Sequence, residues 1–134
     1  MNKQSLLHKE KTPAICKEHI DLENRLMKEL LDRSFVDRVT QDVKYPYGQL
    51  DVYSIQNKKH IYYEIKRTYS KQTVKNTKKQ ALRWLEYQSR MQPRSTSYVI
   101  MYTTTKIRII GRYKNGEIII GGKYVWRENK NHTV

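Results

Sequence analysis

The feature that most constrains the fold is a pair of strand-like segments separated by a short polar link. Residues 50–52 and 61–66 are rich in apolar and β-branched side chains, and Asn57-Lys58 lies midway between them. A two-residue turn at Asn57-Lys58 predicts that the two segments form an antiparallel hairpin. Because the side chains of a strand alternate between two faces, this turn also predicts which residues share a face.

The predicted register separates apolar from acidic side chains. It pairs Leu50 with Ile65 and Val52 with Tyr63, and it places Asp51 opposite Glu64. Alternation then predicts that the two acids lie on the face opposite the apolar pairs, as part of the wall of a cleft.

Helices are predicted on both sides of the hairpin in the sequence. Apolar residues at helical spacing follow Thr12-Pro13, an N-cap with a proline at the first helical position, and continue to Arg33. A second helix is predicted over about residues 73–91, ending before Pro93. Its apolar side is predicted to comprise Val74, Ala81, Leu82 and Leu85.

The remaining segments have strand character. The predicted strands cover residues 34–41, 97–102, 107–113 and 118–124, and Asn115-Gly116 is a strong turn signal between the last two. The order is helix, three strands, helix, three strands. This order predicts an α/β or α+β domain with a mixed central sheet flanked by helices and a C-terminal β-hairpin.

Charge indicates the class of partner. The chain has 134 residues, 27 of them Lys or Arg and 13 Asp or Glu, which gives a net charge of +14 and favours a polyanionic partner. No apolar run is long enough to cross a bilayer, and we expect no membrane association. Cys16 is the only cysteine, and no apolar stretch of signal-peptide length begins the chain, so we expect a reducing, cytoplasmic location.

The opposed acids suggest a metal site. Carboxylates on directly opposite residues of two strands have Cβ atoms roughly 5 Å apart, and like charges so placed repel each other. A divalent cation removes the repulsion, and Mg²⁺ is commonly held by one or two carboxylates. Lys66 lies two residues beyond Glu64, on the same predicted face, where an ammonium can neutralise a phosphate or orient an attacking water. Asp51, Glu64 and Lys66 are therefore the predicted catalytic residues.

These residues also resemble a known family pattern. Gly48-Gln49-Leu50-Asp51, followed by Glu64-Ile65-Lys66, resembles the PD-(D/E)XK nuclease superfamily, although Leu50 replaces the usual proline. The resemblance implies a restriction-endonuclease-like core over about residues 14–103. It implies that Asp51, Glu64 and the Ile65 carbonyl bind Mg²⁺, for which Mn²⁺ substitutes, while Lys66 assists hydrolysis.

The first helix extends the resemblance. Leu22-Glu23-Asn24-Arg25-Leu26 is similar to the corresponding helix of phage junction-resolving endonucleases, which implies that Glu23 joins the metal and catalytic residues. His19 lies one turn earlier, where RecB-like members of the superfamily have a histidine ligand. A single histidine beside an apolar stripe is more often structural, and both roles stay open for His19.

The second helix carries the predicted nucleic-acid contacts. Lys71, Lys75, Lys79 and Arg83 recur at four-residue steps, a spacing that predicts one basic stripe able to follow a phosphate backbone. Gln80 and Trp84 resemble the Gln-x-x-x-Tyr element of RecB-like exonucleases, which implies that Gln80 touches the substrate backbone or the attacking water. The alternative for Gln80 is an amide at the edge of the core.

Three functions follow from these patterns. The first is a Mg²⁺-dependent endonuclease acting on DNA, such as branched or Holliday-junction DNA; junction resolution needs paired cuts and implies a homodimer. The second is a RecB-like exonuclease, and the third is a non-catalytic basic nucleic-acid-binding module. In each case we expect one domain over residues 1–134, with 1–11 flexible and 104–134 forming a hairpin extension and tail.

Overall fold

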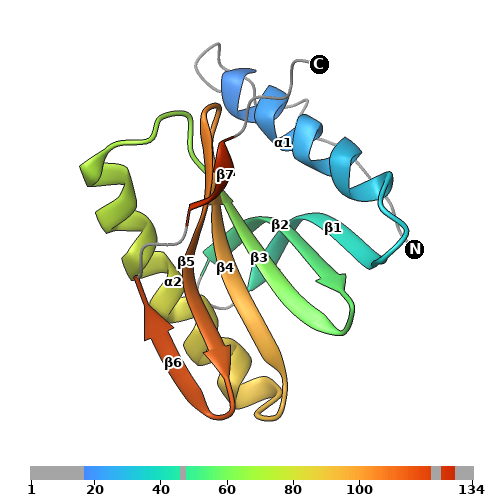
Figure 1. Ribbon diagram of the computed structural model, residues 1–134, viewed down its shortest axis with the longest axis vertical. Helices are drawn as coiled ribbons and strands as arrows, with labels where there is room; N and C mark the ends of the chain where they lie inside the picture. Colours follow the sequence, from blue (N-terminus) through green and yellow to red (C-terminus); the bar gives the residue numbers. More distant parts are fainter. Residues whose placement is uncertain (1–16, 46–47, 122–124, 129–134) are drawn as a thin grey trace.

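A mixed β-sheet with a helix against each of its faces organises this computed structural model, which describes residues 17–45, 48–121 and 125–128 (Figure 1). The elements are α1 (Lys17–Leu31), β1 (Val36–Tyr45), β2 (Gly48–Gln56), β3 (Lys59–Ile65), α2 (Lys71–Met91), β4 (Thr96–Tyr102), β5 (Lys106–Lys114), β6 (Glu117–Ile120) and β7 (Val125–Glu128). The predicted α+β class and the predicted element order are confirmed, and β7 is an additional strand.

The strands form one sheet in chain order. Neighbours follow the order β1-β2-β3-β4-β5-β6, and β7 pairs with the beginning of β5. Among the strands that the structure describes, only β3 and β4 run parallel, and the other pairs are antiparallel. A parallel pair needs a long connection, and α2 provides it between β3 and β4.

Both predicted turns are present. Asn57 and Lys58 have φ angles of 52° and 68°, as a type I′ turn requires, and β2 and β3 pair from Gln56–Lys59 to Val52–Tyr63. Asn115 and Gly116 form the corresponding turn between β5 and β6, with φ angles of 54° and 81°. The predicted register of the first hairpin is therefore confirmed as far as Val52.

Beyond Val52 the hairpin departs from the prediction. The backbone pairing of β2 with β3 ends at Val52, and the earlier part of β2 pairs with β1 alone. Leu50 packs with the residues around α2, whereas Val52 packs with those around α1, so the predicted common face for these two residues is wrong. In β1 the same change of face falls at Asp42, whose φ of 56° lies in the left-handed region that Asp tolerates.

Helices cover both faces of the central strands. Around α1 the buried cluster contains Leu22, Leu26, Met27, Leu30, Val39, Val52, Ile61, Tyr63, Ile65, Ile100, Tyr102 and Ile107. Around α2 it contains Leu50, Tyr62, Val74, Ala81, Trp84, Leu85, Val99, Met101, Ile110 and Tyr113. Both faces of β3 are therefore buried, because this strand lies between two helical layers.

The second helix begins two residues before the predicted start. Ser70 is its N-cap and accepts a hydrogen bond from the Thr73 backbone N–H, in a capping box. Leu82, predicted as part of the apolar side, is 41% exposed, and this prediction is wrong. The buried face turns further round the helix, because Trp84 and Gln88 are inserted against the sheet.

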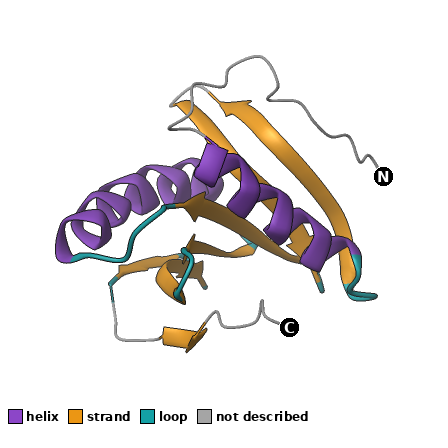
Figure 2. Cartoon of the chain, turned by 90° about the horizontal axis from the view of Figure 1, so that it is seen from above, coloured by secondary structure: helices purple, strands orange, loops and turns teal. Residues whose placement is uncertain are grey.

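The C-terminal strands belong to the common core. Ile107 and Ile110 of β5 enter the clusters around α1 and α2 respectively, so the chain after residue 103 shares the core of the preceding part. The predicted strand over 118–124 is shorter than expected: β6 ends at Ile120, and residues 122–124 lie outside the described part. The predicted N-cap at Thr12-Pro13 and the flexible residues 1–11 also lie outside it. Figure 2 shows the two helices and the sheet from above.

Candidate metal centre and active site

Side chains from α1 and β2 form a group with metal-ligand spacing. One nitrogen of His19 and one carboxylate oxygen each of Glu23 and Asp51 all lie within 4.8 Å of one another. His19 Nε2 is 3.3 Å from Asp51 Oδ1 and 3.6 Å from Glu23 Oε1. The i, i+4 spacing of His19 and Glu23 places both on one side of α1, facing the point where β2 leaves β3. We call these three residues the acidic centre.

The carboxyl group of Glu23 is deeply buried. Its side chain is 0% exposed, and its pKa is raised to about 9 by burial first and then by the negative charges of Asp42 and Asp51. A hydrogen bond with Asp42 favours the protonated form further. A buried acid beside other acids is costly to ionise unless a cation lies among them. The donor set of the acidic centre therefore fits a divalent cation.

His19 responds to the same charges. Its pKa is raised, chiefly by its hydrogen bond to Asp51, although burial acts in the opposite direction. The protonated imidazole adds positive charge to the acidic centre, so the nearby carboxylates favour the protonated form. An imidazole must lose its proton before it can bind a metal.

Asp51 connects the acidic centre to β3. Its Oδ2 accepts a hydrogen bond of 2.9 Å from the Ile65 backbone N–H. The side chain thus takes the place of a backbone acceptor where the β2–β3 pairing has ended. Asp51 is held between α1 and the end of β3 by these contacts.

Glu64 lies on the other face of the sheet. Glu64 is 4% exposed, and its Oε2 accepts a hydrogen bond of 2.7 Å from Trp84 Nε1 of α2. Lys66 Nζ is 4.0 Å from its Oε1. Burial and then the charge of Asp51 raise the pKa of Glu64 to about 7, while the contacts with Trp84 and Lys66 lower it. The charge of Asp51 thus affects the pKa of Glu64, although the Glu64 side chain is held by α2 and the acidic centre lies against α1.

Trp84 is itself fixed by packing. Its ring is stacked on Tyr62 with 5.7 Å between ring centroids, and Tyr62 Oη donates a hydrogen bond to Gln88. Both aromatic side chains are almost fully buried, so they pack the domain and do not offer faces for nucleic-acid bases. This packing determines the direction of the indole N–H that holds Glu64.

A small pocket opens beside Glu64. It has a volume of about 120 Å³, and Gln49, Gln80, Arg83 and Trp84 are among the residues that line it. The Oε1 atom of Gln80 is buried there and has no hydrogen-bond partner within the described chain. Gln80 and Arg83, predicted separately as substrate contacts, therefore lie next to Glu64.

The structure separates some residues that the sequence grouped. Asp51 and Glu23 share the acidic centre, whereas Glu64 lies outside this group and meets it through Asp51 and Ile65. The predicted basic stripe on α2 is also divided. Arg83 lines the pocket beside Glu64, Lys71 and Lys75 line a second cavity, and Lys79 is exposed and lines neither.

Asp42 is the acid that the sequence reasoning missed. Its pairing neighbours, Gln41–Val52 and Val43–Leu50, place it across from Asp51, and its charge raises the pKa of Glu23. The predicted strand over residues 34–41 ended just before Asp42, whereas β1 continues to Tyr45. The role of Asp42 depends on how β1 pairs with β2, which the sequence pattern did not specify.

Comparisons with known proteins add no family assignment. No protein-family model matches the chain, and neither a curated protein nor a solved structure gives a significant match. In the described part of the chain, no helix is long and apolar enough to span a membrane.

Proposed function

We propose that this protein is a metal-dependent endonuclease that hydrolyses phosphodiester bonds in DNA, with branched DNA among its substrates. The observation that carries the proposal is the acidic centre, in which Glu23 is fully buried and Asp51 contacts the end of β3 next to Glu64 and Lys66, in a chain of net charge +14. Acids that need a cation, near a lysine and in a strongly basic chain, suit a phosphodiester substrate. The order helix, antiparallel three-stranded unit, helix, parallel strand supports a restriction-endonuclease-like core.

The residues of the site have distinct roles in this proposal. Asp51 and Glu23 would hold Mg²⁺ or Mn²⁺ on the α1 face, with His19 adding a nitrogen ligand that favours Mn²⁺. Glu64 and the Ile65 carbonyl, the other predicted ligands, would complete the site from the end of β3, where Asp51 contacts Ile65. The cation supplies positive charge to the phosphate and lowers the pKa of the attacking water. Lys66 orients that water and neutralises charge on the phosphate, while Trp84 holds the Glu64 carboxylate in one direction.

The test is cleavage of labelled duplex, flap, four-way-junction, single-stranded DNA and matching RNA with Mg²⁺ or Mn²⁺. We expect Glu64→Gln and Lys66→Gln to lower the rate by about 1,000-fold or more, because metal and charge stabilisation each supply several kcal/mol. Both variants should still bind the substrate. Glu117→Gln, an exposed acid in the β5–β6 hairpin, is the matched control. Absence of cleavage of every substrate, with binding intact, would contradict the proposal in favour of a non-catalytic binding module.

A RecB-like exonuclease is the second candidate. It is favoured by Gln80, which lines the same pocket as Glu64 and Trp84 and whose amide oxygen is buried. An exonuclease requires a free end, so circular and linear DNA of one sequence distinguish the candidates. Degradation of linear DNA alone supports the exonuclease, and nicking of the circle supports the endonuclease.

The homodimer is also part of the endonuclease proposal. Paired cuts across a junction need two active sites related by a two-fold axis. Light scattering of the protein with and without a four-way junction tests this point. A protein that stays monomeric on the junction while cutting it once would contradict the dimer.

A further inference from the structure

A second cavity lies on the opposite side of α2 from the Glu64 pocket. It has a volume of about 570 Å³ and is lined by residues that include Tyr69, Lys71, Lys75, Lys78 and Arg108. Four of these five side chains are cations, and none of the described residues that line the cavity is acidic. We call it the basic cavity.

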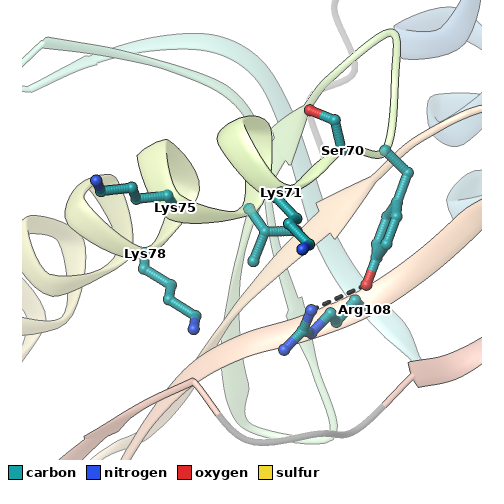
Figure 3. A pocket seen from close by; sticks show the side chains of 7 residues that line it. Ser70, Lys71, Lys75, Lys78 and Arg108 are labelled. Carbon is teal, nitrogen blue, oxygen red and sulfur yellow. Dashed lines mark hydrogen bonds between the residues drawn. The ribbon is translucent and has the colours of Figure 1, made fainter.

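The cations of the basic cavity come from two elements and converge. Figure 3 shows the ends of Lys71 and Lys78 directed from α2 towards Arg108 on β5, while Lys75 points outward. Lys71, Lys75 and Lys78 form no ion pair with any residue in the described ranges. Like charges gathered around a concave surface repel one another, and an anion in that space removes the repulsion.

Tyr69 contacts two cations of β5. Its hydroxyl accepts a hydrogen bond of 2.9 Å from Arg108 Nη1, and the Lys106 ammonium lies 4.7 Å from the centre of its ring. On the other side, the Lys78 side chain passes Gly121 closely enough that a Cβ there would lie 3.6 Å from Lys78 Cε. The cavity is therefore a defined arrangement of cations, and Arg108 presents a planar fork suited to phosphate oxygens.

The position of the basic cavity relates it to the active site. Lys71 lines this cavity and Arg83 lines the Glu64 pocket, and the two residues lie about 18 Å apart along α2 at the usual helical rise. A DNA strand carries one phosphate per roughly 3.4 Å of duplex axis, so this separation spans about five phosphates. Because the two cavities lie on opposite sides of α2, a backbone that contacts both also passes around the helix, which adds to this number of phosphates.

We propose that the basic cavity is an anchoring site for the phosphodiester backbone of the nucleic acid, several nucleotides from the bond that is cut. Arg108 and Lys78, which lie outside the predicted stripe, grip the phosphates together with Lys71 and Lys75. This proposal rests on the nucleic-acid substrate of the proposed function. Contacts of this kind provide affinity and salt dependence and read no base sequence.

The test uses Glu64→Gln protein, so that binding is measured without cleavage. Fluorescence anisotropy with a duplex and a four-way junction is recorded from about 50 to 200 mM salt. We expect Lys78→Gln/Arg108→Gln to weaken binding by about tenfold and to lower the slope of log affinity against log salt by about 2. Lys71→Gln/Lys75→Gln changes only exposed side chains of α2 and should weaken binding and lower the salt slope to a similar extent. This variant tests the site even if replacing Arg108 disturbs folding.

Controls separate this site from general charge. Lys28→Gln/Lys114→Gln removes two exposed cations, on α1 and at the end of β5, and should change the salt slope much less. With Glu64 restored, the cavity variants should raise KM and leave kcat close to that of the parent protein. An equal change of salt slope in the control and cavity variants would overturn the anchoring site. So would a cavity that binds inorganic tripolyphosphate tightly in the parent protein, if the cavity variants kept the DNA affinity of the parent.

The two proposals fail in different ways. Binding that depends on the basic cavity, without cleavage under any metal condition, would overturn the nuclease and leave the anchoring site. If the protein cleaves DNA but the cavity variants have the same salt slope of binding as the parent, the anchoring site is overturned and the nuclease proposal stands.

Discussion

The acidic centre and the basic cavity hold opposite charges in opposite environments. Glu23 is 0% exposed and its pKa is raised to about 9, whereas Lys71 and Lys75 are exposed side chains around an open cavity. Charges at the surface remain solvated and cost little, but a buried carboxylate needs a cation or a proton. In the two proposals, the basic cavity provides affinity for the phosphate backbone and the acidic centre binds the metal.

The distribution of charge along the chain agrees with this difference. Residues 1–33, which include α1, carry seven basic and six acidic residues, so most of the net charge of +14 comes from the rest of the chain. The acidic and basic residues of this segment are almost equal in number. The cations instead gather on α2 and β5, beyond the opposite face of the sheet.

The largest effect expected from this contrast in burial is a dependence of metal affinity on pH. Glu23, with a pKa of about 9, and His19, with a raised pKa, each give up a proton when a cation binds. Mn²⁺ affinity should therefore rise by about 100-fold between about pH 6 and 8. Calorimetry in buffers of different ionisation enthalpy measures the protons released. Metal binding to the His19→Gln variant should release fewer protons and show a smaller preference for Mn²⁺ over Mg²⁺. A metal affinity that does not change with pH would show that the acidic centre is not the metal site.

A smaller effect concerns the stability of the metal-free protein. The pKa of Glu23 is about 9 in the folded state against a reference of 4.5, so its contribution to stability is complete at low pH and is lost as pH rises towards 9. Glu23→Gln should raise the free energy of unfolding near pH 8 by about 1–3 kcal/mol and change it little near pH 4.

Urea unfolding in a chelator measures the effect of Glu23→Gln. Glu117→Gln, in an exposed position, serves as the control and should not change the pH dependence. If Glu23→Gln proved no more stable than the parent protein near pH 8, Glu23 would not be a strained buried acid.

The smallest effect tests the support of Glu64. Trp84→Phe keeps an aromatic ring against Tyr62 but removes the N–H that Glu64 accepts. Because that hydrogen bond lowers the pKa of Glu64, its loss should raise the pKa and shift the acid limb of the cleavage profile to higher pH. We expect kcat to fall by about tenfold with KM almost unchanged. An unshifted profile, with the fold intact by circular dichroism, would assign Trp84 to packing alone.

The local elements were predictable because short-range chemistry specifies them. Asn57-Lys58 and Asn115-Gly116 tolerate the positive φ angles of type I′ turns, and each turn positions its hairpin. The end of α2 before Pro93 follows from the missing N–H and the fixed φ of proline. Predictions based on such signals were confirmed to within a few residues.

The arrangement of the site was less predictable because it depends on pairing between distant segments. The hairpin pattern correctly placed Val52 opposite Tyr63, but it did not show that the strands separate at Asp51. Nor did it show that a helix would cover each face of β3 and bury Glu64 against Trp84. Asp42 joins the acidic group only through the β1–β2 register, and His19 through the docking of α1 on the sheet.

The sequence by itself determined the element order, both hairpin turns and the positive charge, because each is encoded in composition or in neighbouring residues. It also singled out Asp51, Glu64, Lys66 and Glu23 as candidates for one site. Only the tertiary structure decided that Asp51 and Glu23 meet His19 on one face while Glu64 is held by Trp84 on the other. It likewise divided the cations of α2 between two cavities, because the packed face of a helix is chosen by the sheet it covers.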